Sequence, residues 1–154
     1  MAELTHFGAQ GRAKMVDVST KKVTQRQARA RGKITMTPET LQLIEQGQLA
    51  KGDVLGVAQI AGVMGAKQTG RLIPMCHPLG LDGVDLQFFL NKQESCVEIQ
   101  ATVSNTGKTG VEMEALTAVS IAALTIYDMC KAVDRGMILG AIRLVSKTGG
   151  QRGT

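Results

Sequence analysis

Residues 110–131 read GVEMEALTAVSIAALTIYDMCK, and this stretch decides the fold. Its charged residues all lie near its two ends, with Glu112 and Glu114 at the start and Asp128 and Lys131 at the finish. The thirteen residues between Glu114 and Asp128 carry no charge, which is typical of a helix that the rest of the protein covers. Either the charged ends are merely solvated, or two reactive clusters lie at the ends of a buried helix.

The start of this helix determines how the two glutamates are presented. Residues 107–110, GKTG, favour a loop, so we expect the helix to begin only around Glu114 or Ala115 and to end near residues 134–136. In the extended segment before it, Glu112 and Glu114 would share a face, because side chains two apart in a strand point the same way.

The far end of the helix has a simpler geometry. Asp128 and Lys131 are three residues apart and share a helical face. Glu114 and Asp128 are separated by fourteen residues, which is roughly 21 Å of helix. One small ligand can hardly span that distance. If both ends are used, we expect two chains to contribute to one site; otherwise only one end is used.

The other expected elements follow from hydrophobic periodicity and from turn residues. Residues 27–36 alternate between apolar and polar, mostly basic side chains, which predicts a strand with one solvent-exposed, basic face. The helical pattern from Asp53 is apolar nearly all round, which indicates a helix covered on two sides and suggests a subunit interface. In order, the sequence predicts a strand at 27–36, a helix at 37–47, a helix from Asp53 past Met64, a hairpin of strands 84–90 and 97–103, the long helix, and a strand at 138–145.

This order of elements predicts the fold class. With right-handed crossovers, strand, two helices, two strands, helix and strand form an α+β, ferredoxin-like domain: a four-stranded antiparallel sheet with helices packed on one face. We expect a single domain over residues 15–148, a mobile N-terminal tail over 1–14 and a flexible C-terminal tail over 149–154. The fold by itself says little about function.

Composition narrows the cellular setting. The 154 residues are 44% apolar and 20% charged, a globular balance. The first ten residues lack a basic region followed by an apolar block, so no secretory signal is expected, and the polar residues within the long helix argue against a membrane span. Three cysteines without CxxC spacing fit free thiols in a reducing compartment, argue against a structural zinc site and favour a cytoplasmic location.

The net charge of +5 indicates an anionic partner. Only 3% of the residues are aromatic, and Phe88 and Phe89 are adjacent and so face opposite ways, which argues against an RNA-binding sheet. A nucleotide triphosphate fits the same charge. Gly107-Lys108-Thr109 looks like the end of a P-loop, but Thr102 stands where that motif needs glycine.

Two further residues have both a structural and a chemical interpretation. His77 lies in a turn between Pro74 and Pro78, so it is either a structural residue or a general acid or base. Its neighbour Cys76 points to the other side of an extended segment, which argues against a thiol–imidazole pair. Two histidines exclude a three-histidine metal site within one chain. Lys51, before a helix start, is either a solvated lysine or a ligand for phosphate.

Four sequence blocks carry a resemblance to a known family. They are MVDVS (15–19), KGDV (51–54), LIPMCHPL (72–79) and TGKTGVEMEALTAVSIAALTIYDMCKAVD (106–134). From about Met15 to Gly150 the chain resembles the MoaC family, the cyclic pyranopterin monophosphate synthases of molybdenum cofactor biosynthesis. The resemblance departs from the family pattern at Met75, where leucine is common, and at Gly70-Arg71, which affects the expected shape of the local loop.

The resemblance implies a lyase that converts (8S)-3',8-cyclo-7,8-dihydroguanosine 5'-triphosphate to cyclic pyranopterin monophosphate and releases pyrophosphate. It implies homohexamers, built as trimers of dimers, with active sites at a dimer interface. No redox cofactor, nucleic acid or membrane partner is expected, and Mg²⁺ can accompany the triphosphate of the substrate. The alternative from another class is a non-catalytic nucleotide-binding module on the same sheet.

The resemblance also assigns site residues by position. The residues that match the family's catalytic groups are Asp128, Lys51 and Lys131. Those that match its substrate-binding segments are Met75, Cys76, His77, Glu112, Met113, Glu114 and Arg26. No residue is expected to form a dedicated metal site.

Overall fold

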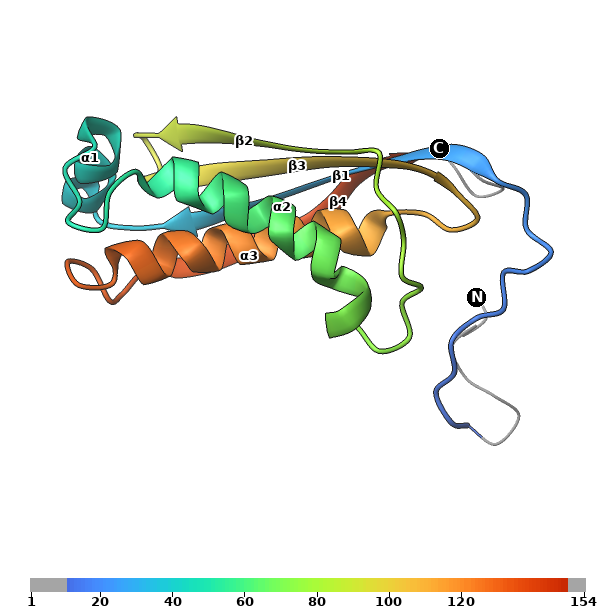
Figure 1. Ribbon diagram of the computed structural model, residues 1–154. Helices are drawn as coiled ribbons and strands as arrows, with labels where there is room; N and C mark the ends of the chain where they lie inside the picture. Colours follow the sequence, from blue (N-terminus) through green and yellow to red (C-terminus); the bar gives the residue numbers. More distant parts are fainter. Residues whose placement is uncertain (1–10, 150–154) are drawn as a thin grey trace.

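The computed structural model describes residues 11–149 of the chain. The expected tails fall largely outside the described residues, since residues 1–10 and 150–154 are not among them. The predicted order of strands and helices is confirmed (Figure 1). The elements are β1 (Thr24–Thr35), α1 (Pro38–Gln46), α2 (Val54–Leu72), β2 (Gly83–Asn91), β3 (Cys96–Gly107), α3 (Glu112–Cys130) and β4 (Ile138–Thr148).

The four strands form one antiparallel sheet in the order β2-β3-β1-β4. Sequential β2 and β3 pair as the predicted hairpin, while the two long connections place β1 and β4 beside each other at the other side of the sheet. This is the predicted ferredoxin-like arrangement. Strand β4 forms one edge, where its pairing with β1 shifts register twice and Ala141 has a positive φ of 53°.

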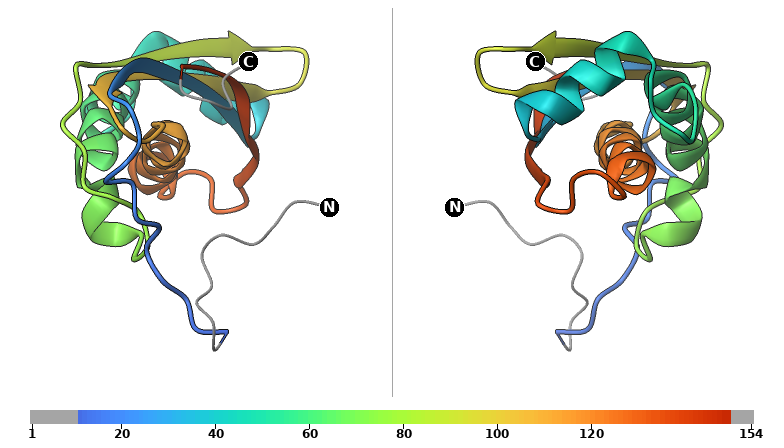
Figure 2. Two further views of the ribbon diagram at one scale, coloured as in Figure 1. Left: turned by 90° about the vertical axis from the view of Figure 1, so that its right-hand side faces the viewer. Right: turned by 90° about the vertical axis from the view of Figure 1, so that its left-hand side faces the viewer.

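The sheet has one covered and one open face. Helices α2 and α3 lie side by side on the covered face, and α1 lies near one end of the sheet (Figures 1 and 2). Burial along β1 alternates as predicted, with Ala28, Ala30 and Ile34 at most 1% exposed. The basic residues between them face the open side, where the guanidinium of Arg31 lies 5.6 Å from the ring centre of Phe89.

Helix α3 is the central element of the core. Its length and its mean hydropathy of 1.3 would suit a membrane span, but half of this stretch is buried inside the fold. Small residues let it approach α2 closely: a Cβ added at Gly62 would contact the side chain of Leu86 and come within 3.1 Å of the Ala118 carbonyl oxygen. The charge-free run is therefore the buried helix that the sequence predicts.

Several predicted boundaries were wrong. Helix α3 begins at Glu112 rather than around Glu114, because the chain turns helical directly after Val111, whose carbonyl accepts from the Ala115 N–H at 3.0 Å. Glu112 and Glu114 therefore point roughly 200° apart around a helix and do not share a face. Helix α2, predicted from Asp53 past Met64 without a stated end, ends at Leu72, whereas the strands β1, β3 and β4 are longer than predicted.

Candidate functional site

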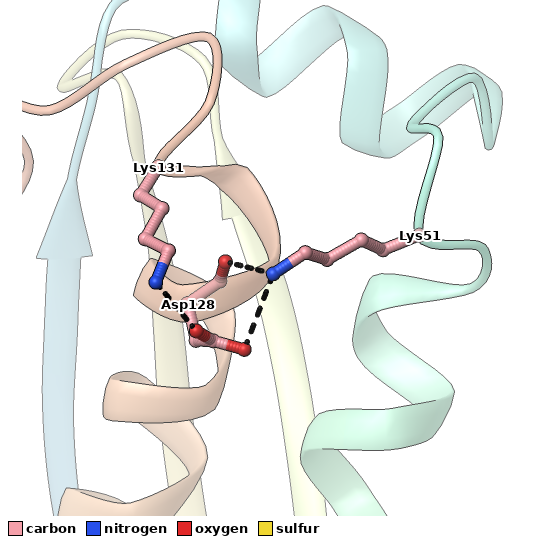
Figure 3. A network of polar contacts seen from close by, with 3 residues as sticks. All are labelled: Lys51, Asp128 and Lys131. Carbon is pink, nitrogen blue, oxygen red and sulfur yellow. Dashed lines mark hydrogen bonds and ion pairs between the residues drawn. The ribbon is translucent and has the colours of Figure 1, made fainter.

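Three of the predicted residues meet at the C-terminal end of α3 (Figure 3). The Lys51 Nζ donates to the Asp128 carbonyl oxygen at 2.9 Å and lies 3.4 Å from Asp128 Oδ2. The Lys131 Nζ lies 3.1 Å from the other carboxylate oxygen, Asp128 Oδ1. We call Lys51, Asp128 and Lys131 the lysine–aspartate cluster.

The local fold explains how these side chains come together. Asp128 is in the last turn of α3 and Lys131 directly follows that helix, so their contact comes from the three-residue spacing. Lys51 comes from the connection between α1 and α2, which turns at Gly52 with a φ of 103°. The following Asp53 caps α2 by accepting from the Gly56 N–H at 3.1 Å. This cap fixes the end of the segment from which Lys51 reaches α3.

The lysine–aspartate cluster suits an anionic ligand. Hydrogen bonding to Lys131 and the charge of Lys51 lower the pKa of the Asp128 carboxyl, which stays ionised at neutral pH. One carboxylate faces two ammonium groups, and the side chains remain accessible, with exposures of 45% for Lys51, 60% for Asp128 and 49% for Lys131. The cluster thus presents positive charge to solvent, as binding to polyphosphate requires.

A second group of predicted residues lies at the N-terminal end of α3. Glu114 is only 2% exposed, and burial raises the pKa of its carboxyl. Its Oε2 lies 3.7 Å from the Cys76 Sγ, whereas its Oε1 has no hydrogen-bond partner among the described residues. A buried carboxyl oxygen without a partner is costly in a folded protein. It therefore marks an acceptor that a bound ligand can satisfy.

The position of Cys76 defines its chemistry. Burial, and then the nearby Glu114 carboxylate, raise the pKa of the thiol to about 11. Cys76 is therefore a neutral thiol at physiological pH and donates its weak S–H hydrogen bond to Glu114. Since a thiolate is the nucleophilic form of cysteine, this environment favours a binding role over nucleophilic catalysis.

Glu112, on another side of the same helical turn, pairs with a residue that the sequence analysis missed. Its Oε1 lies 3.6 Å from the Lys147 Nζ. In the β1–β4 register Lys147 is opposite the buried Ala28, so its side chain is on the face of the sheet that the helices cover. The alternation of side chains along a strand could have placed Lys147 on this face, but the predicted strand, 138–145, ended before it. We call Cys76, Glu112, Glu114 and Lys147 the carboxylate cluster.

The remaining predicted residues either support the loop before α3 or are sequence neighbours of residues in the carboxylate cluster. Arg26 donates from Nε to the Gly107 carbonyl at 3.1 Å and from Nη2 to the Lys108 carbonyl at 3.2 Å, so it braces the loop before α3. His77 and Met75 flank Cys76 and are partly buried, and Met113 is 37% exposed. Hydrogen bonds from Ser19 chiefly lower the pKa of Asp17, with a smaller contribution from the charge of His77.

Within one chain, the structure does not bring the two clusters together. Both lie on α3, and Glu114 and Asp128 are about 21 Å apart along its axis at 1.5 Å per residue. Among residues 11–149, none of the buried side-chain oxygens without a partner lies at the lysine–aspartate end. They belong to β1, β3, the loop between β3 and α3, and the start of α3: Thr24 Oγ1, Asn105 Oδ1, Thr109 Oγ1 and Glu114 Oε1. The same described part of the chain holds no group of three or more His, Cys, Asp or Glu side chains placed to bind a metal ion.

Comparison with known proteins identifies the family. The model of the MoaC family matches residues 15–150. The chain belongs to the MoaC family. Among similar family members is a cyclic pyranopterin monophosphate synthase from Heliobacterium modesticaldum, 61% identical over 99% of this chain and 96% of that protein. Another, of the same name from Desulfitobacterium hafniense, is 62% identical over 98% of this chain and 92% of that protein.

Proposed function

We propose that this chain is a cyclic pyranopterin monophosphate synthase of molybdenum cofactor biosynthesis. Its substrate is (8S)-3',8-cyclo-7,8-dihydroguanosine 5'-triphosphate, and its products are cyclic pyranopterin monophosphate and pyrophosphate, which makes it a lyase. About 60% identity to synthases over nearly the whole chain supports this function. The observation that supports it in the structure is the pair of lysines held on Asp128 at one end of α3, with an unsatisfied carboxyl oxygen of Glu114 at the other end of the same helix.

The lysine–aspartate cluster performs the phosphate chemistry. Closing the cyclic phosphate and expelling pyrophosphate both build negative charge, which the ammonium groups of Lys51 and Lys131 neutralise. Rearrangement of the purine moves protons, and a lysine that loses its proton to the substrate can take one back later. Asp128 is ionised and contacts both lysines, so its role is to orient them and to hold their charge in place.

The carboxylate cluster binds the ring system of the substrate. A guanine-derived ring presents N–H donors, and the free Glu114 Oε1 is an acceptor at a buried position. Met75, His77 and Met113 flank this position and supply apolar and polar contacts to the ring. Arg26 maintains the loop before α3 and, with Lys147, adds positive charge for the phosphates.

A complete site takes one cluster from each of two chains. The two clusters of a single chain lie about 21 Å apart, too far for one nucleotide to contact both. The α2–α3 surface supplies apolar area for assembly, since several large side chains are exposed there: Val57 at 42%, Ile60 at 64%, Met64 at 57% and Leu124 at 55%. We propose a homohexamer, a trimer of dimers, with active sites at the dimer interface.

The proposed setting follows from the chemistry. The enzyme works in the cytoplasm, where its three free cysteines stay reduced. The reaction needs no electron carrier, so no redox cofactor is proposed. Mg²⁺ enters bound to the triphosphate, in keeping with its preference for substrate phosphates and water as ligands.

Turnover of the purified protein tests the proposal. With the cyclised dihydro-GTP as substrate, we expect pyrophosphate release together with pterin fluorescence. Lys51→Ala and Lys131→Ala should each lower turnover by about 10²-fold or more, as the loss of acid–base groups does. Lys33→Ala is the matched control, because Lys33 pairs with Glu94 on the open face of the sheet. Binding without pyrophosphate release would instead support a non-catalytic nucleotide-binding module.

A further inference from the structure

The two lysines of the lysine–aspartate cluster come from segments that are also connected to each other through α1 and the turn after α3. Lys131 follows α3 in a turn that is held by the Cys130 carbonyl, which accepts from the Val133 and Asp134 N–H groups at 3.0 and 3.1 Å. Lys51 lies a few residues beyond α1 and contacts Asp128 in α3. The distance between the two lysines therefore depends on both ends of the Lys51 segment: the Asp53 cap of α2, and the way α1 is held against the turn after α3.

Asp134 makes that connection. Its Oδ2 accepts from the Thr37 N–H at 3.0 Å and from the Thr40 hydroxyl at 3.1 Å. Thr37 caps α1 and Thr40 is in its first turn, where it is 2% exposed. The other carboxylate oxygen, Oδ1, accepts from the Gly136 N–H at 3.2 Å and closes the turn on itself. One carboxylate thus fixes both the start of α1 and the turn after α3.

Other polar contacts tie α1 to a different part of the fold. The Ser95 hydroxyl donates to the Met36 carbonyl at 2.6 Å, and Lys92 pairs with Glu45 at 3.0 Å. Both contacts lead to the β2–β3 hairpin and not to the turn that carries Lys131. They hold α1 on the sheet, but they do not set its position relative to Asp128. Removing a contact to the hairpin should therefore affect stability alone, whereas removing the Asp134 contacts should also shift Lys51 relative to Lys131.

We propose that Asp134 is a positioning residue for catalysis: it holds α1 on the turn after α3 so that Lys51 and Lys131 stay together on Asp128. This proposal rests on the proposed function of that cluster. Asp134 itself touches no substrate. Its effect comes from geometry, since misplacing a catalytic group by about 1 Å can cost up to about 10²-fold in rate.

Turnover and amide exchange test the proposal together. We expect Asp134→Ala to lower kcat by about tenfold or more. Asp134→Asn keeps an acceptor oxygen for Thr37 and Thr40 and loses only the acceptor for the Gly136 N–H, so it should retain clearly more kcat than Asp134→Ala. Ser95→Ala is the matched control, because it loosens the same end of α1 without touching the turn, and its kcat should stay within about twofold.

Amide exchange without substrate reports how firmly the Lys51 segment is held. The N–H groups of Gln48 and Gly52 are hydrogen-bonded in the folded protein, so their exchange reports opening of this segment. Asp134→Ala should speed exchange over residues 48–53, and Ser95→Ala should not. If Asp134→Ala fails to fold, Thr40→Val removes one of the two connecting bonds and should show the same pattern at smaller size.

The outcomes are separable. A kcat of Asp134→Ala within twofold of wild type would overturn the proposal, as would an equal loss in Ser95→Ala or no rescue by Asp134→Asn. Unchanged exchange over residues 48–53 would overturn the positioning itself, even if kcat fell. A wild-type chain that releases no pyrophosphate would refute the proposed function, while the exchange measurement would still decide whether Asp134 positions Lys51.

Discussion

Mixing two inactive variants tests whether each active site is shared between chains. Lys51→Ala removes part of the lysine–aspartate cluster, and Glu114→Gln removes the charge from the buried end of α3 while keeping its shape. Lys51→Ala alone should lose about 10²-fold of turnover. Glu114→Gln should lose about 10- to 100-fold, as expected for one hydrogen bond to a charged group. In a homo-oligomer of either variant, every site carries a defective cluster.

The size of the rescue follows from the placement of the clusters. If each site takes the lysine–aspartate cluster from one chain and Glu114 from its neighbour, random 1:1 assembly makes the first contribution intact in one half of the sites. The second contribution is intact independently in one half of the sites. Multiplying these two fractions gives about one quarter of the sites with both contributions wild type. Mixed oligomers should therefore recover about 25% of wild-type turnover.

The assay uses two affinity tags, so that only oligomers containing both variants are collected, and follows pyrophosphate release. The control pair is Lys51→Ala with Asp128→Ala. These two residues contact each other within one chain, so no arrangement of the two variants yields an intact cluster. Verified mixed oligomers of the first pair that are no more active than the average of the two variants measured separately would refute sharing of the site across chains.

Three other properties are predicted from the structure. Gly62→Ala should lower the free energy of unfolding by about 1–3 kcal/mol in urea titrations, because the new methyl group would press on Leu86 and the Ala118 carbonyl. Burial raises the pKa of Glu114 in the folded chain above its value in the unfolded chain, so this group favours folding at low pH, and its contribution is lost as pH rises from about 4.5 through the raised pKa. Glu114→Gln should therefore flatten the fall of Tm with pH over that window, and a Tm profile identical to wild type would contradict this. Cys76, with a pKa of about 11, should react slowly with iodoacetamide at pH 8, and Glu114→Gln should speed this alkylation, as followed by mass spectrometry.

The sequence predicted most of the sheet because period-two burial is a local property. The alternation of Ala28, Ala30 and Ile34 with basic residues is visible without any tertiary information, and burial confirms it. The start of α3 was missed because Val111 supplies no side-chain cap. The usual sequence signal for a helix start, a capping Ser, Thr, Asp or Asn, is absent there.

The site was predictable only where its contacts are local. Asp128 and Lys131 are three residues apart, so their pairing follows from helix geometry. The contact between Lys51 and Asp128 spans 77 positions of the chain, and that of Asp134 with Thr37 spans 97. Such contacts depend on how the helices pack on the sheet. The resemblance to the MoaC family named Lys51 as a site residue, but only the structure shows which residue it contacts.

The irregular β4 edge has a consequence for solubility during folding. Free strand edges can recruit strands from other molecules, and bulges make an edge a poor template for such pairing. The two register shifts and the left-handed Ala141 interrupt the row of regularly spaced backbone groups along β4. Edge strand β4 is therefore a poor template for edge-to-edge strand pairing between newly made chains.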